Sequence, residues 1–216
     1  MLLLPEILTR DSFNIAELSA CLRDGELMGL DAAYILSDSP DDSATRAKVV
    51  CHNLDPRFVA AGWSAAWVHF AVPFAPRRHT VALRDGVRLR LEPDQRLDLA
   101  QMSYWDDDIV GKPGSFVTSR LRTAIDLARF ESSDSDVRAP LQALVSHSGA
   151  TMTDVQSVLE RRLHLPHKQR AYRRLADALA LDDPINVVHS VDSSNAVQEA
   201  IQVHGVTHLK DEAAQR

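Results

Sequence analysis

The sequence contains little cysteine and no long apolar run. Cys21 and Cys51 are its only cysteines, and each falls in a helical pattern, which is typical of buried thiols and provides no disulfide framework. The most apolar stretch, residues 60–73, is broken by Ser64 and His69 and is shorter than the roughly 20 apolar residues of a membrane helix. We therefore expect no contact with a membrane.

The start of the chain also lacks the pattern of an export signal. The opening leucines are followed at once by Pro5 and Glu6, without the basic flank and long apolar segment of a signal peptide. With 45% hydrophobic and 25% charged residues, the composition is that of an ordinary globular protein. We expect a cytoplasmic location.

Short motifs of common catalytic sites are missing as well. The sequence has no Gly-x-Ser-x-Gly elbow, no Walker loop, no Gly-x-Gly-x-x-Gly turn and no His-Glu-x-x-His helix. A triad of Ser119, His69 and Asp126 is one alternative, but Ser119 has a simpler role as a helix cap and Asp126 as the partner of Arg122. We predict that the protein is not an enzyme, and an enzyme of unknown chemistry is the weakest alternative.

The acidic residues and cysteines do not have the spacing of metal ligands. Asp106, Asp107 and Asp108 are adjacent, so at most two of them converge on one side of a strand, and a surface turn explains them better. The two cysteines form no Cys-x-x-Cys pair. The sequence therefore predicts no metal and no cofactor.

Positive charge is scarce in the first part of the chain. The whole sequence has 30 acidic and 24 basic residues, a net charge of −6. Residues 1–45 hold nine of the acids but only Arg10 and Arg23 as bases, so they carry −7 and the remainder carries +1. Since affinity for nucleic acid depends largely on neutralising phosphates, this imbalance disfavours DNA binding by the first segment.

Periodicity predicts a small first domain. Residues 14–24 have the pattern of a helix with Ile15, Leu18 and Leu22 on one face. A helix followed by two short strands is the unit of a winged-helix head, which we place at residues 1–40. The two strands are predicted at residues 26–30 and 33–36, and a polar linker after them at 37–43.

The rest of the chain, residues 44–216, is predicted as a larger body. A period of two on both sides of Asp85-Gly86 is a strong hairpin signal, and from about Thr118 or Ser119, either of which can cap a helix, the pattern is helical. The fold class is therefore α+β, a small degenerate winged-helix head on a mixed α/β body with a β-hairpin sheet and C-terminal helices. Helices are predicted at 45–54, 64–70, 118–130, 137–146, 151–163, 168–181 and 195–203, strands at 80–84, 87–92, 106–110 and 115–117, and a frayed tail at 205–216.

Four segments occur in an order that is typical of one family. They are residues 22–34 (LRDGELMGLDAAY), 61–69 (AGWSAAWVH), 87–91 (VRLRL) and 116–129 (FVTSRLRTAIDLAR). Over roughly residues 9–180, the chain resembles the AbiEi-type antitoxin and transcriptional-regulator family of actinobacteria. The resemblance implies a winged-helix head that binds promoter DNA and a body that helps to neutralise a nucleotidyltransferase-like toxin. It also implies structural roles for Ser64, His69, Thr118, Arg122 and Asp126.

The sequence departs from the family pattern at the wing. Family heads carry basic residues and a glycine there, whereas residues 28–34 read MGLDAAY. The densest basic stretch lies elsewhere, with six strong bases in residues 161–174. Two interpretations of this stretch are open. It is a surface that binds phosphates or an acidic partner, or it is simply the solvated faces of two helices.

Two functions from different classes are therefore open. In the first, the chain is an AbiEi-like regulator that binds promoter DNA, neutralises a toxin, or does both, and its first helix approaches a DNA groove. In the second, the head no longer binds DNA and offers an acidic face to a basic partner protein. The predicted DNA contacts are Arg10, Arg23, Arg88, Arg90, Arg170, Arg173 and Arg174.

Overall fold

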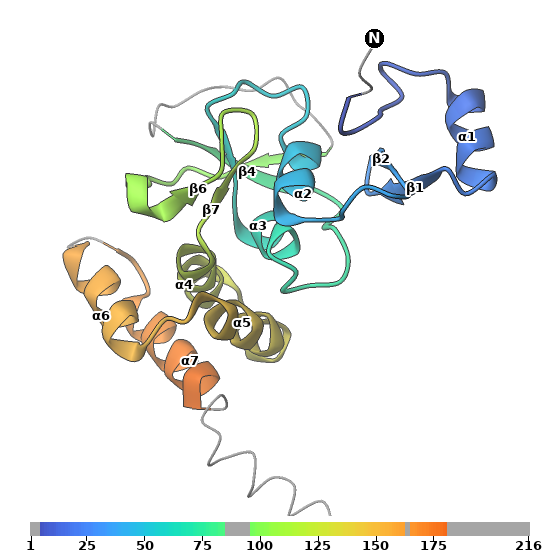
Figure 1. Cartoon of the computed structure of the whole chain (residues 1–216). Coiled ribbons are helices and arrows are strands. Elements are labelled where there is room, and N and C mark those ends of the chain that lie inside the picture. Colours follow the sequence, from blue (N-terminus) through green and yellow to red (C-terminus); the bar gives the residue numbers. More distant parts are fainter. Residues whose placement is uncertain (1–4, 85–95, 163–164, 181–216) are drawn as a thin grey trace, which may run out of the picture.

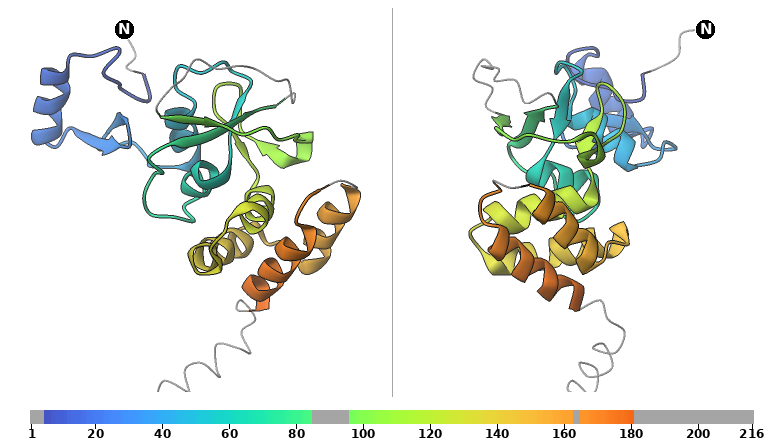
Figure 2. Two further views of the ribbon diagram at one scale, coloured as in Figure 1. Left: turned by 180° about the vertical axis from the view of Figure 1, so that it is seen from behind. Right: turned by 90° about the vertical axis from the view of Figure 1, so that its left-hand side faces the viewer.

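The computed structural model describes residues 5–84, 96–162 and 165–180. In these ranges the chain is α+β, as predicted, with seven α-helices, a two-stranded sheet and a five-stranded sheet. The small sheet lies beside the first helix, the large sheet lies in the middle, and the last four helices gather beyond it (Figures 1 and 2). Among the described residues, no helix is long and apolar enough to cross a membrane.

The first elements match the prediction closely. Helix α1 (Ile15–Arg23) begins after Asn14, whose side chain accepts a hydrogen bond from the backbone N–H of Ala16 at 2.8 Å and so caps the helix. Strands β1 (Leu27–Leu30) and β2 (Ala33–Leu36) pair antiparallel. We keep the name head for residues 5–40, which contain these three elements.

Each face of the head's hairpin contributes side chains to an apolar core. One face, with Leu27 and Leu36, packs against Leu18 of α1. The other face belongs to the core of the body, so the hairpin is a layer between α1 and α2 (Ser43–Val50) rather than a free wing (Figure 1). The residues of this second contact are Leu30, Ala33 and Ile35 of the hairpin and Ala47, Val49 and Val50 of α2.

The large sheet has the strand order β5-β4-β3-β7-β6. Its centre is β3 (Phe58–Ala60), a fully buried strand that pairs antiparallel with β4 (His79–Leu83) and parallel with β7 (Phe116–Thr118). Helix α3 (Gly62–Val68) follows β3 and is also buried along most of its length. The edges are β5 (Leu97–Leu99), parallel to β4, and β6 (Ile109–Val110), antiparallel to β7.

The predicted hairpin and the strand predicted at 106–110 are confirmed only in part. The first arm of the predicted hairpin is confirmed as β4, whereas residues 87–92, its second arm, lie outside the described residues. The strand predicted at 106–110 is wrong in its first half, because η1 (Asp106–Asp108) is a turn of 3-10 helix. The Asp108 carboxylate accepts a hydrogen bond from the backbone N–H of Trp105 at 2.8 Å, which stabilises this turn.

Four helices complete the described part of the body. Helix α4 (Arg120–Phe130) is capped by Ser119, α5 (Asp134–Ser148) by Ser133 and α6 (Met152–Arg161) by Thr151, and α7 (Lys168–Ala180) packs on α4, α5 and α6. They share one apolar core that includes Ile125, Leu141 and Leu175. The helix predicted at 195–203 and the tail at 205–216 lie outside the described residues.

Candidate interaction surfaces

Arg122 and Asp126 belong to a buried charged cluster that joins α4 to the sheet edge. Arg122 donates to Asp126 one turn later at 2.8 Å, as predicted, and Asp126 also accepts from Arg129 at 3.0 Å. Arg122 further contacts Asp108, at 3.0 Å, and so ties α4 to the turn at the sheet edge. All four side chains are almost completely buried, so these residues support the fold and do not reach a partner.

The alternative triad is not assembled. The His69 ring Nε2 lies 2.7 Å from the carbonyl oxygen of Thr118, Ser119 caps α4, and Asp126 is paired with two arginines. Burial lowers the pKa of His69 more than the Thr118 hydrogen bond raises it, and the positive charge of Arg120 lowers it further. His69 is therefore a neutral structural group that joins α3 to β7.

The densest basic stretch is largely used inside the fold. Arg162 pairs with Asp108 and Arg161 with Asp107, the latter at 3.3 Å. Arg170 donates to the carbonyl oxygen of Arg129. Arg174 is buried, pairs with Asp134, and donates to the carbonyl oxygens of Ala128 and Glu131 at 3.1 and 2.8 Å. Of the predicted DNA contacts in this stretch, Arg173 alone keeps an exposed guanidinium, 3.8 Å from Asp134, while Arg88 and Arg90 lie outside the described residues.

The three consecutive aspartates do not converge. Asp106 pairs with Arg84 at 2.8 Å, Asp107 with Arg161 and Asp108 with Arg122. Within the described ranges, no group of three or more histidine, cysteine, aspartate or glutamate side chains could hold a metal ion.

The turn of the head's hairpin is bound to the body by a polar chain that the sequence did not reveal. Asp31 accepts from His79 Nε2 at 3.0 Å and from Arg96 at 2.8 Å. The other ring nitrogen of His79, Nδ1, lies 3.1 Å from the Ser64 hydroxyl, which accepts from the backbone N–H of Thr80 at 2.9 Å. Asp31 itself has a left-handed φ of 53°, unusual for a residue other than glycine.

This Ser-His-Asp chain is structural. Both ring nitrogens of His79 are engaged, Nε2 with the Asp31 carboxylate and Nδ1 with the Ser64 hydroxyl, and this hydroxyl also accepts from the backbone N–H of Thr80. The Ser64 side chain has no exposed surface, so a substrate cannot reach it. The chain therefore joins the hairpin turn to α3 and β4.

More of the head's acidic residues serve the same purpose. Thr9 and Asp11 contact the end of α2, with Thr9 Oγ1 3.3 Å from His52 Nε2 and Asp11 accepting from Asn53 at 2.9 Å. Of the nine acids in residues 1–45, five are thus engaged: Glu6 with Lys48, Asp11 with Asn53, Asp31 with His79, Asp41 with Arg46, and Asp42 as the cap of α2. Three of these acids, Glu6, Asp11 and Asp31, dock the head on the body, whereas Asp41 and Asp42 bind α2 locally.

The outer face of α1 remains free in the described part of the chain. Of the three apolar residues predicted on one face, only Leu18 is buried, whereas Ile15 is 53% and Leu22 42% exposed. These two residues are seven positions apart, so they project from the same side of the helix, with Ser19 between them. Four acidic residues of the head, Glu17, Asp24, Glu26 and Asp38, form no ion pair with any described residue.

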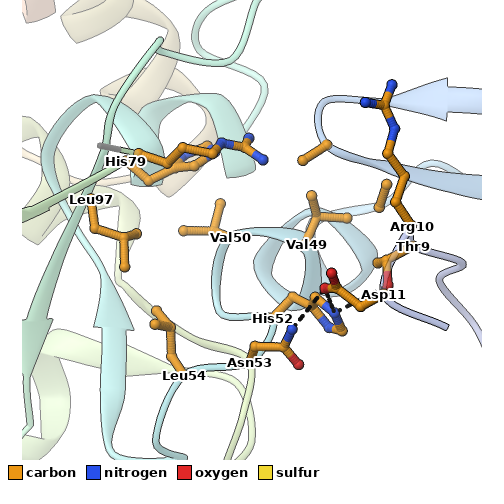
Figure 3. A pocket seen from close by; sticks show the side chains of 13 residues that line it. Thr9, Arg10, Asp11, Val49, Val50, His52, Asn53, Leu54, His79 and Leu97 are labelled. Atoms are coloured by element: carbon orange, nitrogen blue, oxygen red, sulfur yellow. Dashed lines mark hydrogen bonds and ion pairs between the residues drawn. The ribbon is translucent and has the colours of Figure 1, made fainter. Parts of the chain in front are cut away.

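A cleft of about 340 Å³ lies where the head meets the body (Figure 3). Arg10 and Thr9 stand on one side of it, and Val50, Leu54 and Leu97 on the other. His79 and Arg96, which hold Asp31, also line it. The cleft thus borders the contacts that dock the head.

Comparison with known proteins gives little more. No protein-family model and no curated protein matches the chain. Among solved structures, the chain is similar to the crystal structure of RV2827C protein from Mycobacterium tuberculosis, with 15% sequence identity, coverage of 80% of this chain and 76% of that chain, and a TM-score of 0.31. A similarity this weak says nothing about the function of the chain.

Proposed function

We propose that the protein is a non-catalytic, cytoplasmic binding protein of the AbiEi-like antitoxin and regulator kind, and that it acts mainly by contact with another protein. The observation that carries this proposal is the exposed apolar pair Ile15 and Leu22 on the outermost helix of the head. Apolar side chains spaced i, i+7 on one helix face are the anchors by which an amphipathic helix binds in a groove of another protein.

The packing of the hairpin against α1 and the body favours a protein partner over DNA. A wing that reads DNA must project into solvent, whereas this hairpin packs side chains of each face into an apolar core and its turn is held by His79 and Arg96. Helix α1 then has to act alone, and Arg23 is its one basic residue. Too few cations remain in the head to neutralise several phosphates.

The chemistry of the partner follows from the charges around α1. Four carboxylates of the head, those of Glu17, Asp24, Glu26 and Asp38, have no cationic partner among the described residues. A complementary surface has an apolar centre and basic residues around it. A nucleotidyltransferase-like toxin, which the family resemblance implies, is the partner class that we propose.

Affinity capture with the full-length protein tests the proposal. A bait that carries both Ile15→Asp and Leu22→Asp should lose a partner that the wild-type bait retains. Each apolar anchor contributes about 1.5–3 kcal/mol, so the loss of both weakens binding by more than about 100-fold. Arg173→Ala, an exposed change on α7, is the matched control and should retain the partner. Identical capture by all three baits would refute a role for α1.

Promoter DNA is the second candidate, and two observations favour it. Five of the acids in residues 1–45 are engaged within the fold, and Arg10 and Arg23 have no acidic partner among the described residues. The test is fluorescence anisotropy with the DNA upstream of the gene, at low and at physiological salt. Saturable, sequence-dependent binding that weakens with salt and is lost in Arg23→Glu would establish this function.

A further inference from the structure

We propose that the cleft between head and body is a binding site for a small organic carboxylate with an apolar portion. The proposal does not depend on the identity of the macromolecular partner. It rests on the walls of the cleft, on the charges at its mouth and on the position of the cleft at the contact between the two parts.

The cleft has the size and the position of a ligand site. Its volume of about 340 Å³ lies at the lower end of the range of roughly 300–1,000 Å³ that is common for small-molecule sites, which often form between structural units. Residues of the head line one side, and residues of α2, β4 and β5 line the other (Figure 3). A ligand here touches both parts at once.

The body side of the cleft has an aliphatic part, next to the polar side chains of His52, Asn53, His79 and Arg96. The side chains of Val49, Val50, Leu54 and Leu97 come from the end of α2, the loop after it and β5. Val50, Leu54 and Leu97 face the hollow from the side opposite Arg10 (Figure 3). These aliphatic groups suit a saturated ring or a short alkyl chain rather than a highly hydrated ion.

The mouth of the cleft carries a guanidinium, that of Arg10, whose donors are unused among the described residues. The Arg10 guanidinium is exposed and makes no hydrogen bond or ion pair with any described residue. Neither nearby carboxylate pairs with Arg10: Asp31 is held by His79 and Arg96, and Asp11, which keeps its negative charge, accepts from Asn53. An anionic group is therefore the natural complement of Arg10, and a carboxylate matches the two-pronged geometry of guanidinium.

Occupation of the cleft should strengthen the docking of the head. A carboxylate on Arg10 and an apolar group on Val50 and Leu54 connect the segment before α1 with the end of α2. Because a ligand that binds only the folded, docked protein stabilises that state, binding should be visible as a rise in the melting temperature. The structure thus assigns the cleft as a place where a small molecule can stiffen the surface that carries α1.

The test uses cyclohexanecarboxylate, with cyclohexanecarboxamide and inorganic phosphate as controls at equal ionic strength. Cyclohexanecarboxylate should raise the melting temperature of the full chain by about 5–11 °C at a hundredfold excess over its Kd, and the two controls should not. Arg10→Ala should weaken binding about tenfold, whereas Arg23→Ala, the same change outside the cleft, should leave it unchanged.

Either of two results would overturn the proposal. One is the absence of any shift with cyclohexanecarboxylate, or an equal shift with its amide. The other is an equal loss of affinity in Arg10→Ala and Arg23→Ala, since that would mean that net charge and not the cleft determines binding. Both variants change exposed side chains, so circular dichroism should confirm that they fold.

Discussion

Replacing Asp31 by alanine removes the carboxylate that holds the hairpin turn against the body. Asp31 accepts from His79 at 3.0 Å and from Arg96 at 2.8 Å, and its side chain is 18% exposed. A hydrogen bond to a charged group contributes about 1.5–3 kcal/mol when it is buried, as at His79, whereas the Arg96 pair lies closer to solvent and contributes about 0–1 kcal/mol. We expect Asp31→Ala to lower the free energy of unfolding by about 2–4 kcal/mol.

Two further variants separate the hydrogen bonds from the backbone strain. Asp31→Asn keeps an acceptor oxygen and should lose less than Asp31→Ala. Asp31→Gly loses the same hydrogen bonds as alanine but relieves the left-handed φ of 53°, so it should be about 1–2 kcal/mol more stable than Asp31→Ala.

Urea unfolding followed by tryptophan fluorescence is the appropriate assay. The Trp67 ring lies close to His79, with 6.2 Å between ring centroids, so its fluorescence reports on this contact. Hydrogen exchange of residues 27–36 adds a local readout of hairpin docking. An Asp31→Ala protein as stable as the wild type, with unchanged exchange in the hairpin, would refute the docking role. Equal stability of the glycine and alanine variants would refute the strain.

The same contact has a definite pH dependence. Burial by itself raises the pKa of Asp31, but the hydrogen bond and charge of His79, with a backbone hydrogen bond and Arg96, outweigh it and hold the pKa below its usual 3.8. A carboxyl with a lowered pKa stabilises the fold fully above its unfolded pKa and loses that effect as the pH falls through the folded value. The difference between wild type and Asp31→Ala should therefore be constant above about pH 5 and shrink below pH 4.

Three other outcomes follow from buried groups. Asp126→Ala leaves the guanidiniums of Arg122 and Arg129 buried without this carboxylate, so it should lower the free energy of unfolding, measured with denaturant, by about 3–5 kcal/mol. The exposed Asp107→Ala should lower it by less than about 1 kcal/mol, and equal losses would contradict the role of the buried cluster. The pKa of His69 is lowered, so its contribution to stability is present above its unfolded pKa of 6.5 and is lost as the pH falls below it; an NMR titration midpoint at or above 6.5 would be inconsistent with this. Burial raises the pKa of Cys51 to about 11, more than a backbone hydrogen bond lowers it, so a thiol reagent at pH 8 should modify Cys21 alone until the protein unfolds.

Local patterns predicted most of the helices and one part of the buried cluster. Ser119 marks the start of α4, and Arg122 and Asp126 are one turn apart, so both the helix and the pair follow from spacing within a few residues. Strand β3 was not predicted as a strand, because Phe58–Ala60 is only three residues long and apolar throughout, without the alternation of a half-buried strand.

The docking of the hairpin could be predicted only in part. Leu27 and Leu36 on one face and Leu30 and Ile35 on the other make both sides apolar, a signal of burial on both faces that a solvent-exposed wing would not carry. The chain from Asp31 through His79 to Ser64 gave no signal, because these residues are 48 and 15 positions apart and meet only through the tertiary fold.

Photo-crosslinking at α1 tests the central claim most directly. The photoreactive residue p-benzoylphenylalanine, placed at position 19 between Ile15 and Leu22, should give a light-dependent adduct with a protein in cells that express the full chain. The same residue at position 156, on the exposed side of α6 and far from α1 in Figures 1 and 2, should not. Equal adducts at both positions, no protein adduct at position 19, or an adduct with DNA there would contradict the account.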